Sequence, residues 1–249
     1  MIFRLSGVRK RRDAAYTLSV SSFSVRRGEY VALTGPSGCG KSTALDLLGM
    51  VLRPDGEGCF ELYPHAAQAG EDPGAVDVLD LWRRGALDEM AALRRRYMGY
   101  VLQTGELLPF LNVEQNILIA ASLKNMSAEG ARDSAEELMQ TLCVTHVRSA
   151  MPASLSVGER QRVAVARALV GQPAVILADE PTAALDPRMA RQVMSLFLET
   201  VQKSGAALVM VSHDIGLVRE FGLRETSVGV LPHGEGVTAV IDDGAGREA

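Results

Sequence analysis

Runs of apolar residues at two different spacings predict that strands dominate the N-terminal part of the chain. Strand-like runs lie at Ile2–Val8, Thr17–Val25 and Tyr30–Leu33. The alternation within Thr17–Val25 is typical of a strand with one buried face. A helical pattern follows over residues 41–52, and a further strand is expected at Cys59–Tyr63. The pattern therefore predicts three strands, a helix and a fourth strand, in that order.

Residues 64–92 interrupt this regular pattern. The stretch His65–Ala75 is rich in alanine, glycine, proline and acidic residues, which favours a loop. Val76–Ala92 then carries apolar residues at irregular helical spacing, including the single tryptophan, Trp82. We interpret residues 64–92 as an insertion, a solvated excursion closed by a short helix, with a partner-docking element as the alternative.

Two strongly apolar runs in the second half of the chain predict strands that are buried on both faces. These runs, Ala174–Ala178 and Ala206–Val211, are separated by a helical pattern at Arg188–Lys203. Together they indicate a βαβ unit within a parallel sheet. Upstream of them, a strand is expected at Tyr97–Leu102 and helical structure over residues 113–147.

A glycine-rich stretch joins the predicted third strand to the first helix and matches the pattern G-x-x-x-x-G-K-[ST]. It consists of Gly35, Pro36, Ser37, Gly38, Cys39, Gly40, Lys41, Ser42 and Thr43. Glycines let backbone N–H groups crowd around a polyphosphate, and the helix that follows directs the positive end of its dipole at the same anion. Lys41 is expected to reach the β- and γ-phosphates, and the Ser42 hydroxyl to ligate Mg²⁺. The stretch therefore predicts a nucleoside triphosphate site.

Composition narrows the range of partners. Lys and Arg number 26 against 30 Asp and Glu, a net charge of −4, so there is no overall electrostatic case for nucleic-acid binding and none is expected. The basic cluster Arg9–Arg12 is interpreted as a solvated loop. The three cysteines have neither CxxC spacing nor paired histidines, which fits a reducing compartment and argues against a zinc site.

The sequence contains no apolar run of the roughly 18 residues that a membrane-spanning helix needs. Its first residues, Met1–Leu5, are too short and too interrupted for a signal peptide. We therefore expect a chain without a transmembrane helix, which acts at a membrane only through a partner.

An acidic pair ends the first of the two buried strands. In open α/β sheets, ligands bind beyond the carboxyl ends of the strands, which is where Asp179 and Glu180 are expected to lie. Asp179 is then placed to hold Mg²⁺, directly or through water, and Glu180 to polarise a water that attacks the γ-phosphate. The alternative is a pair of acids that simply begins a loop.

The segment Leu155–Arg162 has both a structural and a functional interpretation. Ser156 and Glu159 have the spacing of a capping box, which would open a helix at Arg160–Leu169. The same geometry, with Gly158, offers N–H groups and a hydroxyl to an anion. Because one chain cannot easily wrap a single triphosphate with two separated helix N-termini, a second copy of the chain could supply this one in trans.

In this order, the motifs resemble those of ATP-binding cassette (ABC) ATPases, over roughly residues 2–232. Gly35–Thr43 resembles the Walker A loop, Gln103 the Q-loop glutamine, Leu155–Arg162 the LSGGQ-type signature, Ala178–Thr182 the end of Walker B, Ala184–Asp186 the D-loop, and Ser212–Asp214 the segment of the switch histidine. Glu106–Leu111 is similar to cassettes that serve lipoprotein-release, macrolide-export and cell-division permeases.

The chain departs from the family pattern at two places. In the signature, Val157 replaces the usual first glycine and Glu159 the glutamine, while Ser156 and Gly158 remain. Near residue 12 the family places an aromatic that stacks on adenine, whereas this chain has arginine. Since a guanidinium plane can also stack on a base, Arg12 and the nearby Tyr16 are the residues we expect at the adenine.

The resemblance implies an α/β fold: a P-loop NTPase core with a mixed or parallel sheet, an N-terminal antiparallel β subdomain and a small α-helical subdomain. Residues 1–242 would form a single ABC ATPase domain, with its core at 1–103 and 151–242 and the helical subdomain at about 104–150. Residues 243–249 would be a tail, since the segment from Asp242 onward has the composition of a frayed end.

The resemblance also implies the activity, that of an ATP-binding and ATP-hydrolysing subunit of an ABC transporter. Two cassettes would close head to tail as a homodimer or pseudo-dimer around two ATP molecules with Mg²⁺, and the chain would lie on the cytoplasmic face of the inner or plasma membrane. Their closure would drive an integral membrane permease subunit. The alternative is a mechanoenzyme or regulatory ATPase outside transport, in DNA repair or at the ribosome.

By the same resemblance, individual residues acquire roles in hydrolysis. Glu180 would be the general base or water-orienting group, and His213 would contact the γ-phosphate. Gln103 would reach Mg²⁺ and the attacking water, and so report loss of the γ-phosphate to the helical region. The stretch Leu107–Leu111 is expected to be exposed, facing a groove for a permease helix, with ordinary packing of the helical subdomain as the alternative.

Overall fold

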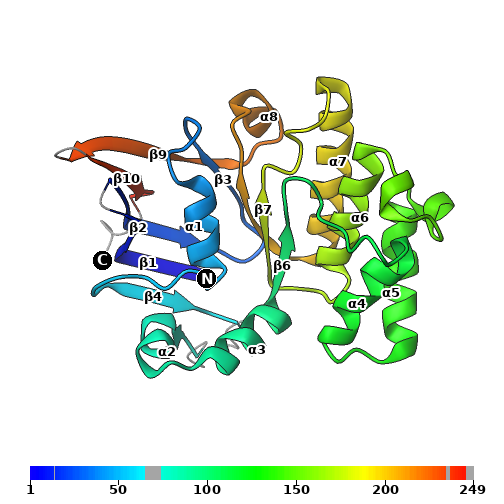
Figure 1. The fold of residues 1–249 in the computed structure, drawn as a ribbon, viewed down its shortest axis with the longest axis horizontal. Helices are drawn as coiled ribbons and strands as arrows, with labels where there is room; N and C mark the ends of the chain where they lie inside the picture. Colours follow the sequence, from blue (N-terminus) through cyan, green and yellow to red (C-terminus); the bar gives the residue numbers. More distant parts are fainter. Residues whose placement is uncertain (14, 65–73, 234–235, 245–249) are drawn as a thin grey trace. The chain divides into compact units, whose positions relative to one another are not determined.

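The computed structural model describes residues 1–13, 15–64, 74–233 and 236–244 (Figure 1). The chain divides into two compact units. Unit 1 comprises Met1–Arg94 together with Val211–Ala249, and unit 2 comprises Arg95–Met210.

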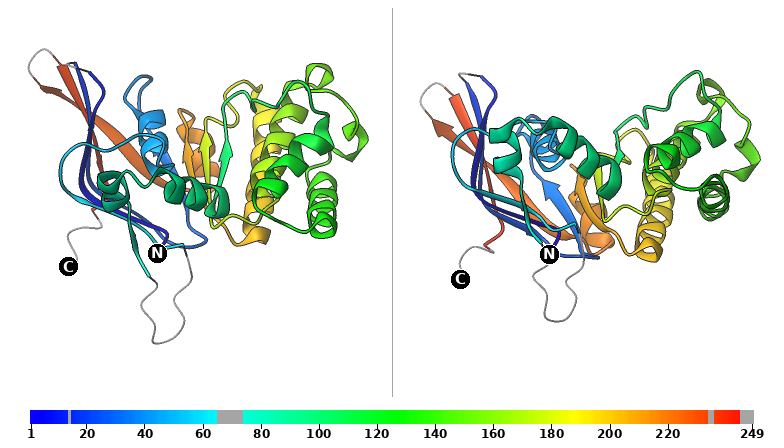
Figure 2. Two further views of the ribbon diagram at one scale, coloured as in Figure 1. Left: turned by 60° about the horizontal axis from the view of Figure 1, so that its bottom comes forward. Right: turned by 90° about the horizontal axis from the view of Figure 1, so that it is seen from below.

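Unit 1 is built on a mixed sheet in which distant parts of the chain lie side by side (Figure 2). Its strands follow the order β5-β4-β1-β2-β10-β9-β3. They are β1 (Phe3–Arg11), β2 (Tyr16–Val25), β3 (Tyr30–Thr34), β4 (Cys59–Leu62), β5 (Val76–Asp77), β9 (Arg224–His233) and β10 (Gly236–Asp242). β1 pairs antiparallel with β2 and β4, whereas β10 runs parallel to β2 and β9 parallel to β3. The antiparallel N-terminal strands and the mixed sheet confirm the predicted fold class.

The strands form because their apolar residues alternate toward one side. In β1, Phe3 and Leu5 are buried while Arg4 and Ser6 between them are exposed. The Phe3 ring lies 6.3 Å from that of Phe60 in the neighbouring strand β4, measured between centroids. Such tilted aromatic pairs add to the stabilisation from buried area alone. This alternation is why the sequence predicted these strands to within a few residues.

The basic cluster at residues 9–12 was expected to be a solvated loop, and that expectation was wrong for most of it. Arg9, Lys10 and Arg11 belong to β1. Lys10 Nζ pairs with Asp55 Oδ1 at 3.2 Å, and the backbone N–H of Arg11 donates to Asp55 Oδ2 at 2.7 Å. One carboxylate thus anchors the end of this strand.

Part of the predicted insertion is folded into unit 1. Residues 65–73 lie outside the described residues, but β5, α2 (Val78–Arg84) and α3 (Leu87–Tyr97) follow them. Asp77 caps α2 by accepting a hydrogen bond from the Asp80 N–H. Val78, Leu81 and Met90 are at most 3 % exposed, and α2 packs on β4. The expectation of a solvated excursion was therefore wrong for the faces of these helices that carry Val78, Leu81 and Met90, whereas Leu87 at the start of α3 is 60 % exposed.

Unit 2 contains the parallel strands that the apolar runs predicted. β6 (Met98–Val101) pairs in parallel with β7 (Val175–Asp179), and β7 neighbours β8 (Ala207–Val211), whose last residue already belongs to unit 1. The first four residues of β7 and all of β8 are buried. Gly99 of β6 has no room for a side chain, since a Cβ there would lie 2.4 Å from the Ala168 carbonyl oxygen.

Helices make up the rest of unit 2, and Figure 1 shows them gathered together. They are α4 (Val113–Leu123), α5 (Ala128–Thr141), α6 (Val157–Leu169) and α7 (Pro187–Ser204), with short 3₁₀ turns η1 (Thr145–Val147) and η2 (Pro152–Ser154). The helical region predicted over 113–147 is thus two helices and a turn. α7 begins where Asp186 caps it and Pro187 takes the first helical position, and it ends at Gly205 in the left-handed conformation.

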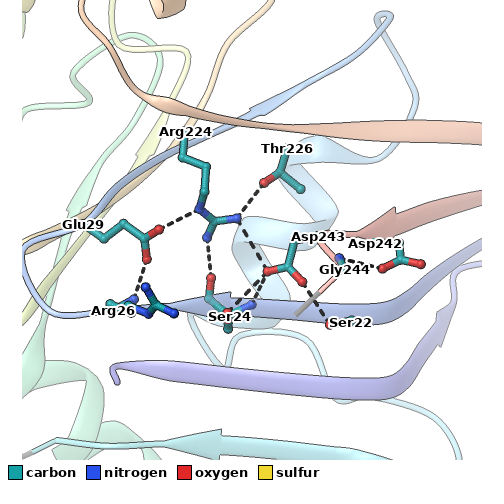
Figure 3. A network of polar contacts seen from close by, with 9 residues as sticks. All are labelled: Ser22, Ser24, Arg26, Glu29, Arg224, Thr226, Asp242, Asp243 and Gly244. Carbon is teal, nitrogen blue, oxygen red and sulfur yellow. Dashed lines mark hydrogen bonds and ion pairs between the residues drawn. The ribbon is translucent and has the colours of Figure 1, made fainter. Parts of the chain in front are cut away.

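The two strands after residue 223 were not predicted, and an ion network lies at their base in the sheet (Figure 3). Arg224 of β9 donates to Glu29 Oε1 at 2.7 Å and to the Ser24 carbonyl at 2.5 Å. Its guanidinium also lies 3.5 Å from Asp243, whose side chain is only 2 % exposed. Asp243 accepts hydrogen bonds from Ser22 Oγ and from the Ser24 N–H.

This network corrects the predicted tail. Asp242 ends β10 and Asp243 is anchored to β2, so the expectation of a frayed end was wrong for these two residues. The remaining residues of the predicted tail, 245–249, lie outside the described residues. The short helix α8 (Ile215–Glu220) completes unit 1. In the described part of the chain, no helix combines the length and the apolar character needed to cross a membrane.

Candidate nucleotide site

The predicted phosphate loop leaves β3 and enters α1 (Lys41–Leu48), as expected from the sequence. The α1 N-cap is Gly40, whose φ of 96° is left-handed and favours glycine. A Cβ at Gly40 would lie 1.5 Å from Tyr16 Oη, and one at Gly35 would lie 2.9 Å from the Val228 carbonyl oxygen. Both glycines are therefore required by close approach as well as by conformation.

Lys41 is folded back across this loop. Its Nζ donates to the carbonyl oxygens of Gly35 and Pro36, each at 2.9 Å, and the residue is only 5 % exposed. Burial of an ammonium group is costly unless it is hydrogen-bonded. The loop carbonyls meet that cost here and hold a positive charge inside the turn that the glycines form.

Tyr16 and Arg12, the residues expected at the adenine, both contact the phosphate-loop region. Tyr16 Oη donates to the Cys39 carbonyl at 3.2 Å, and burial raises the pKa of its phenol. Arg12 Nη1 donates to Thr43 Oγ1 at 3.4 Å. Cys39 itself is 4 % exposed. These contacts support the loop from β2 and the end of β1.

His213 lies just after β8, in the part of unit 1 that the switch motif predicted. The backbone on both sides of it is fixed by local hydrogen bonds. The Ser212 N–H donates to the Leu33 carbonyl at 3.1 Å, and Asp214 caps α8 by accepting from the Leu217 N–H at 2.9 Å. The imidazole is thus presented from a short, firmly held connection next to β3.

In unit 2, Gln103 and the acidic pair meet at one sheet edge. β6 and β7 are parallel neighbours, so Gln103 after β6 and Asp179 at the end of β7 leave the sheet together. Gln103 Nε2 donates to Glu180 Oε2 at 3.4 Å. Glu180 has a φ of 44°, a left-handed value that costs free energy for a residue with a side chain. Residues held in this way are concentrated at functional sites.

Ser156 is the N-cap of α6, and the predicted capping box is present. Glu159 N–H donates to Ser156 Oγ at 3.3 Å, while the Ser156 N–H donates to Glu159 Oε2 at 2.9 Å. The helix begins at Val157, three residues before the predicted start at Arg160. Gly158 is buried, and a Cβ there would lie 3.2 Å from Met189 Sδ.

The loop after Gln103 is held by side chains that sequence reasoning missed. Arg167 of α6 donates to the carbonyl oxygens of Gly105 and Glu106, both at 3.0 Å. Asn116 of α4, with no exposed surface, accepts from the Leu108 N–H. Its amide nitrogen donates to the Leu108 and Leu111 carbonyl oxygens of this loop and to that of Asn112, the N-cap of α4. The signal was present in the sequence as an asparagine within an apolar helical run.

The stretch Leu107–Leu111 was expected to be exposed, which is wrong for its first residue. Leu107 is only 9 % exposed, whereas Phe110 is 71 % exposed. The loop therefore packs through one end and presents Phe110 to solvent.

The candidate residues divide between the two units. Unit 1 contains the phosphate loop, Arg12, Tyr16 and His213, and unit 2 contains Gln103, Ser156, Gly158, Asp179 and Glu180. Within unit 1, Arg12 and Tyr16 are brought to the phosphate loop. Within unit 2, Gln103 is brought to Glu180, while Ser156 lies elsewhere in the chain, at the N-terminus of α6.

The chain is similar to known proteins. Residues 18–183 match the family described as ABC transporter. The lipoprotein-releasing system ATP-binding protein LolD of Bacteroides thetaiotaomicron is 34% identical over 218 residues, which cover 88% of this chain and 93% of that protein. LolD of Hydrogenovibrio crunogenus is 39% identical over 207 residues, covering 82% and 83%.

A solved structure agrees with these sequence matches. The ATP-binding cassette MJ0796, a dimer in a post-hydrolysis state bound to ADP and Pi, is 32% identical, with a TM-score of 0.72 and coverage of 91% of this chain and 93% of that one. The predicted family, fold and activity are thus confirmed. The chain belongs to the ABC transporter family, and it is an ATP-binding cassette, the ATP-hydrolysing subunit of such a transporter.

Proposed function

We propose that this cassette hydrolyses ATP with Glu180 as the group that activates water, and that hydrolysis drives a permease of the lipoprotein-releasing type. The contact that carries the catalytic part is the 3.4 Å hydrogen bond from Gln103 to Glu180 at the ends of two parallel strands. A carboxylate that an amide holds in this position, on a residue with a strained backbone, has the chemistry of a water-orienting pair.

The phosphate loop binds the triphosphate. Its glycines keep side chains away from the backbone N–H groups, and α1 adds its dipole at Gly40. Lys41 exchanges its two bonds to loop carbonyls for bonds to the β- and γ-phosphate oxygens, which are stronger because they are charge-assisted. Arg12 and Tyr16 lie beside the loop and provide the surface for the adenine.

The donor set fits Mg²⁺. The Ser42 hydroxyl, the Gln103 amide oxygen and the Asp179 carboxylate are oxygen ligands, which this hard cation prefers. Across the described residues there is no cluster of three His, Cys, Asp or Glu side chains of the kind that builds an all-protein metal site. Mg²⁺ usually takes few protein ligands and shares the nucleotide's phosphates. When bound, the ion would neutralise charge on the β- and γ-phosphate oxygens.

The remaining residues act on the attacking water. The oxygen of this water attacks the γ-phosphorus while Glu180 accepts one of the water's protons. The bond between the γ-phosphorus and the β–γ bridging oxygen breaks, and ADP and phosphate leave. Gln103 keeps the Glu180 carboxylate oriented, and His213 donates a hydrogen bond to the γ-phosphate. Catalysis of phosphoryl transfer depends mainly on such positioning and charge stabilisation.

A second cassette completes each nucleotide site. Ser156 and Gly158 of one copy face the γ-phosphate bound by the other, so that ATP holds the dimer together. The dimeric cassette MJ0796, bound to ADP and Pi, supports this assembly. The chain itself then lies on the cytoplasmic face of the membrane, attached to an integral permease subunit, and relatives of the lipoprotein-releasing system support that class of permease.

The substitution Glu180→Gln tests the catalytic assignment. The variant should bind ATP as the parent chain does but lose turnover by at least about 100-fold, since general-base catalysis contributes roughly 10² to 10⁴ in rate. It should also accumulate an ATP-dependent dimer in size-exclusion chromatography. Retention of parental hydrolysis would refute Glu180 as the base. Co-purification with a membrane protein from detergent extracts tests the permease assignment separately.

A further inference from the structure

His146 and Glu159 form a polar chain that ends at the Ser156 hydroxyl. His146 Nε2 lies 2.9 Å from Glu159 Oε1, and Glu159 Oε2 lies 2.6 Å from Ser156 Oγ. All three residues belong to unit 2: His146 to the 3₁₀ turn η1, and the other two to the start of α6. The chain therefore joins a residue outside the signature segment to the serine proposed to contact ATP.

The charges of this chain fix the direction of its hydrogen bonds. Hydrogen bonds from Ser156 and then from His146 lower the pKa of Glu159 to about 2, so its carboxylate is ionised at neutral pH and can only accept. The Ser156 hydroxyl must then donate to Oε2, and 2.6 Å is typical of an O–H donor on a carboxylate. His146 must likewise carry its proton on Nε2.

This arrangement conflicts with phosphate binding unless the carboxylate is compensated. A serine hydroxyl has one hydrogen to donate, and here Glu159 takes it. To donate to a γ-phosphate, Ser156 must turn away from Glu159, which leaves a carboxylate close to an approaching anion. A cation or donor on the far oxygen of that carboxylate keeps it in place and offsets its charge.

We propose that His146 is a positioning residue for Ser156, which it prepares to bind the γ-phosphate across the dimer by holding the Glu159 carboxylate. The proposal rests on the assignment of Ser156 to the partner's nucleotide. The His146 side chain is 63 % exposed and that of Glu159 only 19 %. The imidazole can therefore be replaced without opening the core, while the carboxylate it holds has a restricted position.

The test is ATP-driven dimerisation of the full-length chain in the Glu180→Gln background, followed by size-exclusion chromatography at increasing ATP. Addition of His146→Ala should raise the ATP concentration needed by about threefold, the scale expected for a partly exposed pair of side chains. His146→Arg should restore the parental requirement because arginine supplies both donor and charge. In chains with Glu180 intact, His146→Ala should raise the KM for ATP and leave kcat unchanged.

A double-mutant cycle separates positioning from general destabilisation. In Glu159→Gln chains there is no carboxylate to compensate, so His146→Ala should have no further effect. Gln140→Ala is a matched control, because it deletes an exposed 2.8 Å hydrogen bond to Glu136 in the same unit without touching Glu159. An unchanged ATP requirement in His146→Ala, or an equal change in the Glu159→Gln background, would overturn the proposal.

Ser156→Ala distinguishes failure of the Ser156 assignment from failure of the His146 proposal. If this variant dimerises like the parent, the assignment of Ser156 to the partner's nucleotide fails, and the His146 proposal falls with it. If Ser156→Ala loses the dimer while His146→Ala does not shift the ATP requirement, only the His146 proposal is wrong.

Discussion

The N-termini of α1 and α6 are both proposed to bind phosphate, yet they are built in opposite ways. α1 begins at Gly40, a residue with no side chain that could accept from the first-turn N–H groups. α6 begins at Ser156, whose hydroxyl and backbone both bond to Glu159 in a closed capping box. The α1 end therefore relies on groups beyond its cap residue to satisfy these donors, while the capping box of α6 satisfies the N–H groups of Ser156 and Glu159 within the chain.

This difference separates the tasks of the two ends. An uncapped helix start inside a glycine loop with a buried lysine favours an anion whenever one is present. A helix start with a capping box must break existing hydrogen bonds before it can bind phosphate, so its net binding free energy for phosphate is smaller than that of an uncapped start. We therefore expect α1 to supply most of the affinity for ATP, and α6 to supply a weaker interaction that decides when two cassettes close.

The largest effect should come from Lys41→Ala. Loss of the buried ammonium removes charge-assisted bonds to the triphosphate, and ATP affinity should fall by about 100-fold, the upper part of the range for hydrogen bonds to charged groups. Isothermal titration calorimetry measures this directly. Lys203→Ala, at an exposed position near the end of α7, is the control and should bind as the parent does. If Lys41→Ala binds ATP as tightly as the parent chain, Lys41 does not hold the phosphates. The proposed difference in ATP affinity between the N-termini of α1 and α6 would then be wrong as well.

An intermediate effect is expected from Ser156→Ala. The substitution removes a helix cap, which costs about 1 kcal/mol of unfolding free energy, and it should also abolish the ATP-dependent dimer while leaving ATP binding by the monomer intact. Ser127→Ala is the matched control, because Ser127 caps α5 by accepting from the Gly130 N–H. Chemical denaturation should show a similar loss of stability in both variants. An equal loss of dimer in both would mean that Ser156 acts only as a cap.

The smallest effect should be a dependence of stability on pH. Because the pKa of Glu159 lies below that of a carboxyl in the unfolded chain, its contribution to stability is present above about pH 4 and disappears as pH falls toward 2. Glu159→Gln removes this titration. The difference in melting temperature between parent and variant should shrink over that range, and a constant difference from pH 6 to pH 2 would contradict the assigned hydrogen bonds.

Local features were predictable from the sequence because neighbouring residues determine them. The phosphate loop, the capping box at Ser156 and the buried strand before Asp179 each depend on a few adjacent residues. The strands β9 and β10 were missed because their pattern, with exposed Val230 and Leu231, is not that of a buried strand. The burial of Val78, Leu81 and Met90 in α2 and α3 was not predicted, because a short apolar face next to a loop-like segment carries little periodic signal.

The roles of individual catalytic residues and the boundaries of the helical subdomain were also inferred from sequence, and they stay predictions. The structure adds the hydrogen-bond partners that these side chains have within their own unit. Such partners decide which substitution is a fair control, as the pairs Ser156 with Ser127 and His146 with Gln140 illustrate.

By itself, the sequence predicted a nucleoside triphosphate site at Gly35–Thr43, and its ordered motifs identified the ABC family. Only the tertiary structure decided which distant residues meet. Gln103 reaches Glu180 because β6 and β7 are parallel neighbours, and Asp243 becomes buried because β10 lies against β2. Likewise, His146 reaches Glu159 only because η1 and the start of α6 come together. Hydrogen bonds act over about 3 Å, so they depend on the path of the chain through space, which local patterns do not specify.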